Sequence, residues 1–185
     1  TSYQDEYGAG SNSTPLNGGL RLANQIQSDL RNLKASGWTY WQAVEDNNGS
    51  NWGLIIAPFD GNNNWFNLRR QYYAMQQFSA FIRPGSQILD QTHEETTAAY
   101  DARTDTTTLV ITNNDTATAV NSYSLVDKSA EFTRIVRTYG TTETFKALGP
   151  VSVNAGQINV SALGESITTI VVHHKPNLIE NATFS

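Results

Sequence analysis

Glu6 is the first side chain whose position in the sequence suggests chemistry. It follows a short strand-like segment and precedes Tyr7-Gly8-Ala9-Gly10. It is therefore expected at the carboxyl end of a strand, where parallel α/β proteins bind their ligands. A carboxylate there can act as an acid, a base or a nucleophile, although a glutamate before a loop is also commonly just solvated. Asp5 is not expected to be its partner, because adjacent strand residues point to opposite faces.

A second group of candidates combines aromatic rings with an amide and a carboxylate: Trp38, Tyr40, Trp41, Gln42 and Glu45. Sugar rings need this combination, because their C–H faces stack on aromatic rings and their hydroxyls bond planar polar groups. Core packing is the alternative, above all for Trp38 and Tyr40. The same two interpretations, sugar platform or packing against a neighbouring helix, hold for the tryptophans of two asparagine-rich loops, Trp52 and Trp65.

Other kinds of chemistry find little support in the sequence. The chain has no cysteine, and His93, His173 and His174 do not stand at metal-ligand spacing with other histidines or carboxylates. We interpret the three histidines as surface or sandwich residues. Phosphate-binding glycine loops and a glycine-flanked nucleophilic serine are absent too. The sequence thus predicts no metal site and no cofactor.

Composition limits the possible partners. The 185-residue chain carries a net charge of −5, has a pI near 5.1 and contains no run of Lys or Arg, which disfavours nucleic acid and anionic membranes. No apolar stretch is long enough for a transmembrane helix. An uncharged, polar substrate fits better. Asn-x-Ser/Thr sequons favour a secreted protein, and they occur at Asn12, Asn48, Asn114, Asn159 and Asn181.

The elements that must position these residues change character near residue 88. Before it, the pattern predicts strands over 2–8, 38–44 and 52–56 and helices over 16–35 and 69–82, with Gly37 at the end of the first helix. Alternating strands and helices are typical of parallel α/β architecture. Strands buried on both faces need neighbours that this stretch does not contain.

After residue 88 the helical period disappears, and short strands alternate with Thr-, Asn- and Gly-rich turns. This spacing predicts an antiparallel sandwich with its own core, interpreted as a structural or binding module. Asn113-Asn114-Asp115 and Tyr139-Gly140 are expected to be hairpin turns. The strands are predicted over 97–101, 107–112, 119–126, 132–139, 142–147, 150–153, 157–161 and 166–173.

Several segments together resemble glycoside hydrolase family 30. The segments are Asp5–Gly8, Gly19–Ala23, Gly37–Glu45, Asn51–Ile55, Tyr72–Phe78, Phe81–Gly85 and Ala98–Asp101. The resemblance implies α/β plus all-β architecture: residues 1–87 form the last strand–helix units of a (β/α)8 TIM barrel, and residues 88–185 form its side β-sandwich. The first six or so strand–helix units are then expected elsewhere, in the same protein or in a separate chain, and this chain alone is expected to be inactive.

The resemblance also implies an activity, that of a retaining endo-glycanase acting on plant cell-wall β-glycan. Glu6 matches the family's nucleophile, with Asp5 where the family commonly has serine. Tyr7, Trp41, Gln42 and Glu45 are expected to contact a polysaccharide or oligosaccharide substrate. The acid/base glutamate has no counterpart here. Endo-β-1,4-xylanase is placed slightly ahead of endo-β-1,6-galactanase, and a non-catalytic carbohydrate-binding fragment is the competing interpretation.

Overall fold

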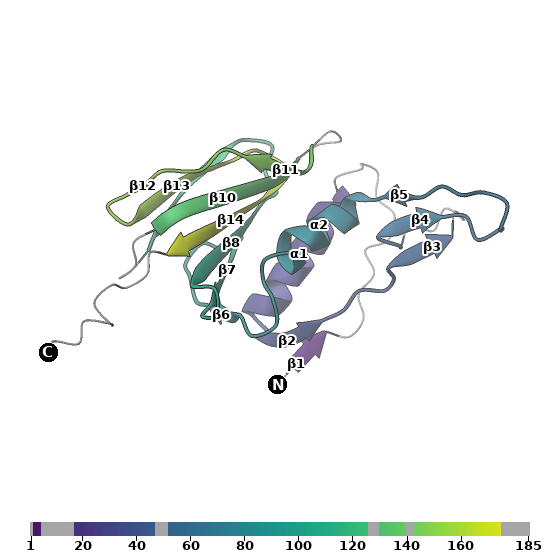
Figure 1. Cartoon of the computed structure of the whole chain (residues 1–185), viewed down its shortest axis with the longest axis horizontal. Coiled ribbons are helices and arrows are strands. Elements are labelled where there is room, and N and C mark those ends of the chain that lie inside the picture. The colour runs from purple at the N-terminus through teal and green to yellow at the C-terminus, as the bar shows by residue number, and fades with distance from the viewer. Residues whose placement is uncertain (1, 5–16, 47–51, 126–129, 140–142, 175–185) are drawn as a thin grey trace, which may run out of the picture.

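The protein is described by a computed structural model that covers residues 2–4, 17–46, 52–125, 130–139 and 143–174. It is mostly β-sheet, with two helices among the described residues (Figure 1). In chain order the elements are β1 (Ser2–Gln4), α1 (Asn17–Arg31), β2 (Ala35–Trp38), β3 (Val44–Asp46), β4 (Ile55–Ala57), β5 (Asn67–Leu68), α2 (Arg70–Ser79), β6 (Gln87–Leu89), β7 (Thr96–Asp101), β8 (Thr106–Asn113), β9 (Ala119–Ser124), β10 (Ala130–Tyr139), β11 (Glu143–Leu148), β12 (Val153–Asn154), β13 (Gln157–Ala162) and β14 (Ser166–His174).

The carboxyl-terminal half forms an antiparallel sandwich, as its sequence predicts. A six-stranded sheet in the order β11-β10-β14-β8-β7-β6 packs against a three-stranded sheet in the order β12-β13-β9. Their shared core contains Leu109, Ile111 and Ile170 from the larger sheet and Ile158 and Val160 from the smaller one. In β13 buried and exposed residues alternate, because only one face of that strand meets the core.

The connection after β8 differs from the prediction. Asn113-Asn114-Asp115 was expected to close a hairpin, but β9 pairs with β13 rather than with β8. The chain therefore passes from the larger sheet to the smaller one at this turn. The second expected hairpin is confirmed in its strands, since β10 and β11 pair antiparallel with Tyr139 opposite Glu143. Its Gly140 lies outside the described residues.

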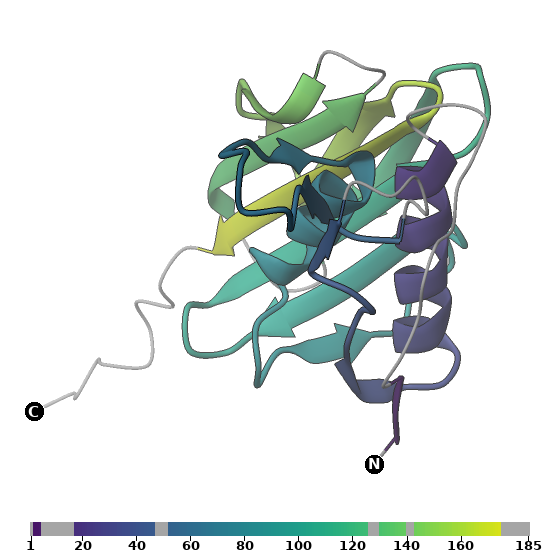
Figure 2. The ribbon, with the colours of Figure 1, turned by 90° about the vertical axis from the view of Figure 1, so that its right-hand side faces the viewer.

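Both helices cover the other face of the six-stranded sheet (Figures 1 and 2). Leu22 and Ile26 of α1 and Phe78 of α2 share a core with Val110 of β8 and Ile167 of β14. This second layer explains why β14 is buried along almost its whole length, whereas a sandwich strand with one solvent face would alternate. The helices and the sandwich are thus joined through one apolar core.

Helix α1 ends earlier than its apolar period predicts. It stops at Arg31, and Leu33, which extends the apolar stripe in the sequence, is 58% exposed. Lys34 has a positive φ of 52°, and β2 begins at the next residue. Gly37 lies inside β2 instead of ending the helix. The predicted second helix over 69–82 corresponds to α2, which ends at Ser79.

The strand predicted over 38–44 is wrong. Instead, β2 ends at Trp38 and pairs in parallel with β1, and β3 begins at Val44 and pairs in parallel with β4. Strand β5 then pairs antiparallel with β4. The aromatic run between the two strands is not buried as predicted, since Trp41 is 57% exposed. The (β/α)8 barrel and the division into residues 1–87 and 88–185 remain predictions.

Candidate functional site

The sequence-predicted site residues fall into two groups. Glu6 and Tyr7 lie outside the described residues, so the roles proposed for them stay predictions. Trp41, Gln42 and Glu45 lie together in the segment that connects β2 to β3 and in β3 itself. That segment stands on the side of the helices away from the sandwich (Figure 1).

Glu45 is buried at the centre of β3, with 3% of its surface exposed. Its carboxylate oxygen Oε2 accepts a hydrogen bond from the backbone N–H of Gly53 at 2.6 Å. A Cβ atom on Gly53 would come within 2.6 Å of the Glu45 Cβ and 2.7 Å of the Ile55 carbonyl oxygen. Glycine at 53 therefore allows the two chain segments to approach, and Glu45 helps to hold the turn before β4. Contact of Glu45 with a sugar remains a prediction.

Hydrogen bonds hold the backbone of the segment that contains Trp41 and Gln42, while the Trp41 side chain is exposed to solvent. The Gln42 carbonyl accepts from the Leu54 N–H at 3.0 Å, and the Ala43 carbonyl accepts from the Ile55 N–H at 2.9 Å. The peptide bond between Trp41 and Gln42 is cis. An exposed indole on a hydrogen-bonded backbone is a suitable stacking surface for a sugar ring.

The neighbouring aromatics Trp38 and Tyr40 have structural partners, in agreement with the packing interpretation. The Trp38 indole Nε1 donates to Oδ2 of the buried Asp29 in α1 at 2.8 Å. The Tyr40 hydroxyl donates to the Trp52 carbonyl at 2.8 Å. The rings of Trp38 and Tyr40 stack on each other with centroids 6.2 Å apart. These contacts tie the segment before Trp41 to helix α1 and to the turn at Trp52.

Three further exposed aromatics lie between β4 and β5. Phe59, Trp65 and Phe66 are 64%, 39% and 66% exposed. The sequence reasoning singled out Trp65 but missed the two phenylalanines, although an aromatic residue in a loop of asparagines and glycine is itself a signal. With Trp41 and the half-exposed Trp52, the segment 41–66 presents five solvent-exposed aromatic side chains.

Asp60 organises this loop. Its carboxylate accepts hydrogen bonds from the Asn62 N–H at 2.9 Å, the Asn63 N–H at 3.3 Å and the Asn63 side-chain amide at 2.8 Å. These bonds, above all that from the Asn62 N–H, lower the pKa of Asp60. Asp46 of β3 accepts from the Phe59 N–H at 3.1 Å. The loop is therefore held by its own polar groups while its aromatic rings face solvent.

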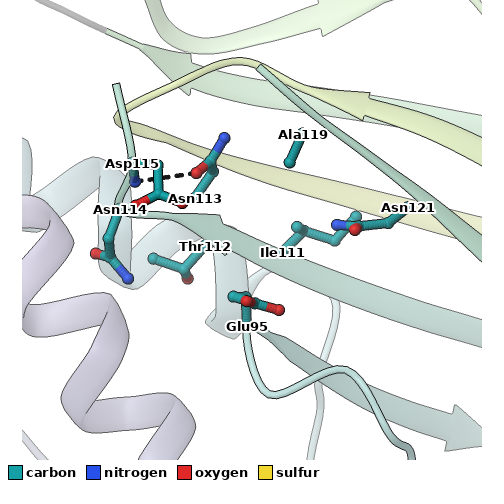
Figure 3. Close-up of a pocket in the computed structure, with 8 residues that line it drawn as sticks. All are labelled: Glu95, Ile111, Thr112, Asn113, Asn114, Asp115, Ala119 and Asn121. Carbon is teal, nitrogen blue, oxygen red and sulfur yellow. Dashed lines mark hydrogen bonds between the residues drawn. The ribbon is translucent and has the colours of Figure 1, made fainter. Parts of the chain in front are cut away.

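A small polar cavity lies in the sandwich, beside the turn that follows β8 (Figure 3). It has a volume of about 170 Å³, and Asn113, Asp115, Asn121 and Glu95 contribute to its wall. Asn113 uses its side chain for the turn itself: its amide donates to the Ala117 and Ala162 carbonyls at 2.9 and 3.0 Å, and its oxygen accepts from the Asp115 N–H at 3.0 Å. This arrangement braces the connection between the two sheets.

The histidines lie in the sandwich, as interpreted from the sequence. His174 is buried, with Nε2 2.8 Å from the Thr107 hydroxyl, and the His93 ring packs 4.9 Å from that of Tyr123. Within the described residues, no group of three or more His, Asp or Glu side chains could hold a metal ion. No helix in the described part of the chain has the length and apolar character needed to span a membrane.

Three of the known proteins that resemble this chain show what it is similar to. The chain is 32% identical over 95 residues to an endo-β-1,6-galactanase of Hypocrea rufa, a match that covers 51% of this chain and 19% of the relative. The catalytic domain of a family 30 xylanase C from Talaromyces cellulolyticus superposes with a TM-score of 0.77 at 20% identity, over 92% of this chain and 40% of the xylanase. A family 30 subfamily 8 xylanase from Clostridium acetobutylicum gives a TM-score of 0.75 at 20% identity, over 92% and 42%.

No family model matches the chain. The resemblance to glycoside hydrolase family 30 is nevertheless confirmed, because its xylanases share the fold of the described chain and a galactanase shares sequence with half of it. The chain spans about a fifth of the length of the curated relative and about two fifths of the solved structures.

Proposed function

Taking the resemblance to glycoside hydrolase family 30 as the premise, we propose that this chain is part of an endo-glycoside hydrolase that degrades a plant cell-wall β-glycan. The observation that carries the proposal is the shared fold over 92% of the chain with family 30 xylanases. The exposed Trp41 ring, on its hydrogen-bonded backbone, supports a sugar-binding role for the segment after β2. The partners are a polysaccharide or oligosaccharide and the barrel segment that supplies the remaining strands.

The proposed mechanism is retaining, with Glu6 as the nucleophile. Such a reaction uses two carboxyl groups about 5–5.5 Å apart. Glu6 attacks the anomeric carbon and forms a glycosyl-enzyme ester, while an acid/base carboxyl group from the remaining barrel protonates the leaving oxygen. That second group then removes a proton from water, which attacks the anomeric carbon and releases the sugar. Trp41 and Gln42 would hold the sugar ring by stacking and hydrogen bonding.

Two substrates are candidates. The sequence reasoning placed β-1,4-xylan first, and both xylanase structures support that choice at the level of fold. The identity of 32% to an endo-β-1,6-galactanase exceeds the 20% identity to either xylanase. This difference favours β-1,6-galactan as the first substrate to assay. Secretion is part of the proposal, and the described sequon asparagines Asn114 and Asn159 are both exposed.

The test is Glu6→Gln in the complete protein, assayed on β-1,6-galactan and on xylan. We expect hydrolysis to be abolished while glycan binding is largely kept, because the amide retains the shape of the carboxylate but cannot form the ester. Asp5→Asn is the matched control, since its side chain is expected on the other face of the strand. Substantial turnover by Glu6→Gln would reject the assignment. Glycan affinity without turnover in the unmodified protein would favour the carbohydrate-binding alternative.

A native and a denaturing intact mass should precede these assays. A species of the size of a whole barrel plus sandwich, or a second chain that supplies the other strands, would support the complete hydrolase. A lone chain of 20.4 kDa, allowing for glycans, would leave the binding-module interpretation ahead.

A further inference from the structure

A groove opens on the six-stranded sheet where helix α2 ends. Strand register places Arg134, Val171 and Thr108 side by side across β10, β14 and β8. The next row toward the end of the sheet contains His173 and Thr106. This is the face that the helices cover further along, and Phe81 and Arg83 border it after the last turn of α2. The resulting cavity, called here the Arg134 groove, has a volume of about 260 Å³.

Arg134 is held in the groove by ring stacking. Its guanidinium carbon lies 5.4 Å from the centroid of the Phe81 ring. That ring stacks in turn on Phe145, with centroids 5.8 Å apart and planes 10° from parallel. Arg134 is exposed and forms no ion pair with another residue of the described part of the chain. Because stacking uses the face of a guanidinium, its N–H groups remain available along the edge for a planar anion.

The groove is positively charged in a protein whose net charge is −5. Arg83 borders it, exposed, with Nη1 donating to the Ser79 carbonyl at 2.9 Å. Among the described residues of its wall, the one carboxylate belongs to Asp101, and Arg103 already compensates that charge. Arg103 Nη2 lies 2.7 Å from Oδ2 of Asp101, and Nε lies 3.1 Å from Oδ1. Two arginines, Arg83 and Arg134, are therefore left facing the cavity without a carboxylate of their own among the described residues.

The rest of the wall suits a sugar better than a bare anion. Thr104 and Thr106, whose hydroxyls lie 2.8 Å apart, line the cavity together with the half-buried His173. Hydroxyl and imidazole groups can exchange hydrogen bonds with sugar hydroxyls. Val171 and the edge of Phe81 add apolar surface for the C–H groups of a pyranose ring. A guanidinium beside hydroxyl groups and a small apolar wall matches a sugar that carries a carboxylate.

We propose that the Arg134 groove binds a uronic acid residue of an acidic polysaccharide, with the carboxylate bidentate on Arg134. The carboxylate would lie along the edge of the stacked guanidinium, and the ring hydroxyls would face Thr106 and His173. Arg83 would add a second positive charge without a fixed geometry. The groove would then anchor acidic glycan to the sandwich face of the protein. This inference goes beyond the proposed hydrolase and does not depend on it.

The test is a titration of the complete protein by isothermal calorimetry. Trigalacturonate is the probe, and neutral galactotriose is its uncharged counterpart. We expect saturable binding of trigalacturonate at about 0.15 M ionic strength, and affinity for galactotriose lower by about ten-fold or more. Arg134→Ala should abolish the preference. Arg134→Lys should recover little of it, because an ammonium group cannot form the bidentate pair. Equal affinity for the two oligosaccharides would overturn the proposal.

Arg21→Ala is the matched control, since it removes one exposed positive charge of α1 outside the groove. It should leave trigalacturonate binding unchanged, whereas a loss equal to that of Arg134→Ala would point to general charge attraction and overturn the proposal. Inorganic phosphate that competes at the same concentration as trigalacturonate would overturn the assignment to a sugar. Urea unfolding curves that match those of the unmodified protein establish that all three variants fold. Turnover of neutral glycan by Arg134→Ala should be unchanged, which keeps this test separate from that of Glu6.

Discussion

Glu143 is a residue of the sandwich whose ionisation is expected to affect stability. Arg137 binds both oxygens of its carboxylate, at 2.7 and 2.9 Å, and Lys146 adds a contact at 2.9 Å. The hydrogen bonds from Arg137, with a smaller effect of Lys146, lower the pKa of Glu143 from 4.5 to about 2, against the raising effect of burial. Only 14% of the Glu143 side chain is exposed, so solvent screens this pair weakly.

The pH dependence follows from the sign of this shift. A carboxylate with a depressed pKa in the folded state stabilises the fold above its unfolded pKa of about 4.5, and this stabilisation is lost as the pH falls toward 2. Glu143→Gln should therefore lower the free energy of unfolding by at most about 3 kcal/mol at pH 6. The difference from the unmodified protein should shrink as the pH falls below 4.5 and should be small near pH 2. Urea unfolding between pH 2 and 6 measures it, with the exposed Glu165→Gln as control. A stability difference between Glu143→Gln and the unmodified protein that does not change with pH would contradict the lowered pKa of Glu143.

Gly53 offers a second prediction at the scale of one residue. Because a Cβ there would come within 2.6 Å of Glu45 Cβ and 2.7 Å of a backbone oxygen, Gly53→Ala must displace β3 from the turn before β4. We expect a loss of about 1–3 kcal/mol in the free energy of unfolding. Gly149→Ala is the matched control, since a Cβ at Gly149 would meet nothing within 4 Å. Thermal unfolding of both variants tests this prediction. Equal midpoints for Gly53→Ala and Gly149→Ala would show that β3 and the turn before β4 can move apart at no cost.

At the scale of elements, a buried amide attaches helix α2 to the sandwich. Gln77 is fully buried, its side-chain amide donates to the Thr138 hydroxyl at 2.9 Å, and its side-chain oxygen accepts from the Thr169 hydroxyl at 2.6 Å. One side chain of α2 thus satisfies hydroxyl groups of β10 and β14. A hydrogen bond of this kind contributes about 0.5–1.5 kcal/mol to the free energy of unfolding.

Gln77→Leu should lower the free energy of unfolding by about 1–3 kcal/mol, because two buried side-chain hydrogen bonds are lost while the side-chain volume is nearly kept. The Thr169 hydroxyl keeps its bond to the Gln77 backbone carbonyl at 3.1 Å, and the Thr138 hydroxyl keeps its bond from the Phe145 N–H at 3.3 Å. Gln76→Leu, at a half-buried position in the same helix, should change it by less than about 0.5 kcal/mol. Chemical denaturation of both variants provides the comparison. A loss of similar size at both positions would contradict the role given to the buried bonds of Gln77.

The elements that the sequence predicts correctly are those whose pattern is local. The eight strands expected after residue 88 correspond to β7 to β14, although the one predicted over 150–153 meets β12 at Val153 alone. Strand-forming residues, and the turn residues between strands, are local signals. The predictions that are wrong concern side chains whose burial depends on segments distant in the sequence. Trp38–Val44 has the composition of a buried strand, yet Trp41 is exposed, and Leu33 continues the stripe of α1 beyond its end. Strand composition cannot specify which neighbour covers a strand.

In the candidate site, too, local features could be predicted and contacts between distant segments could not. Trp41, Gln42 and Glu45 could be singled out by residue type, but the bond from Gly53 to Glu45 depends on the parallel pairing of β3 with β4, which no spacing reveals. The Arg134 groove was missed altogether. Its residues come from the segment after α2 and from β7, β8, β10 and β14, and the register of the sheet brings the strand residues together.

At the scale of the whole molecule, the division between the helices and the sandwich can be tested. The sandwich has an internal core, but its larger sheet also buries Val110 and Ile167 against the helices. A chain of residues 88–185 would expose these side chains, together with the buried Thr138 and Thr169 that α2 covers. An apolar sheet face that has lost its helical cover favours association and lowers stability.

Residues 88–185 produced alone should therefore unfold at lower urea concentration than the 1–185 chain and should self-associate, as measured by analytical ultracentrifugation. The whole chain should unfold in one transition, because both layers share the core at Val110 and Ile167. A double substitution, Val110→Thr with Ile167→Thr, should reduce the self-association of 88–185, since it makes the uncovered face polar. A monomeric 88–185 as stable as the longer chain would establish the sandwich as an independent domain and would strengthen the carbohydrate-binding alternative.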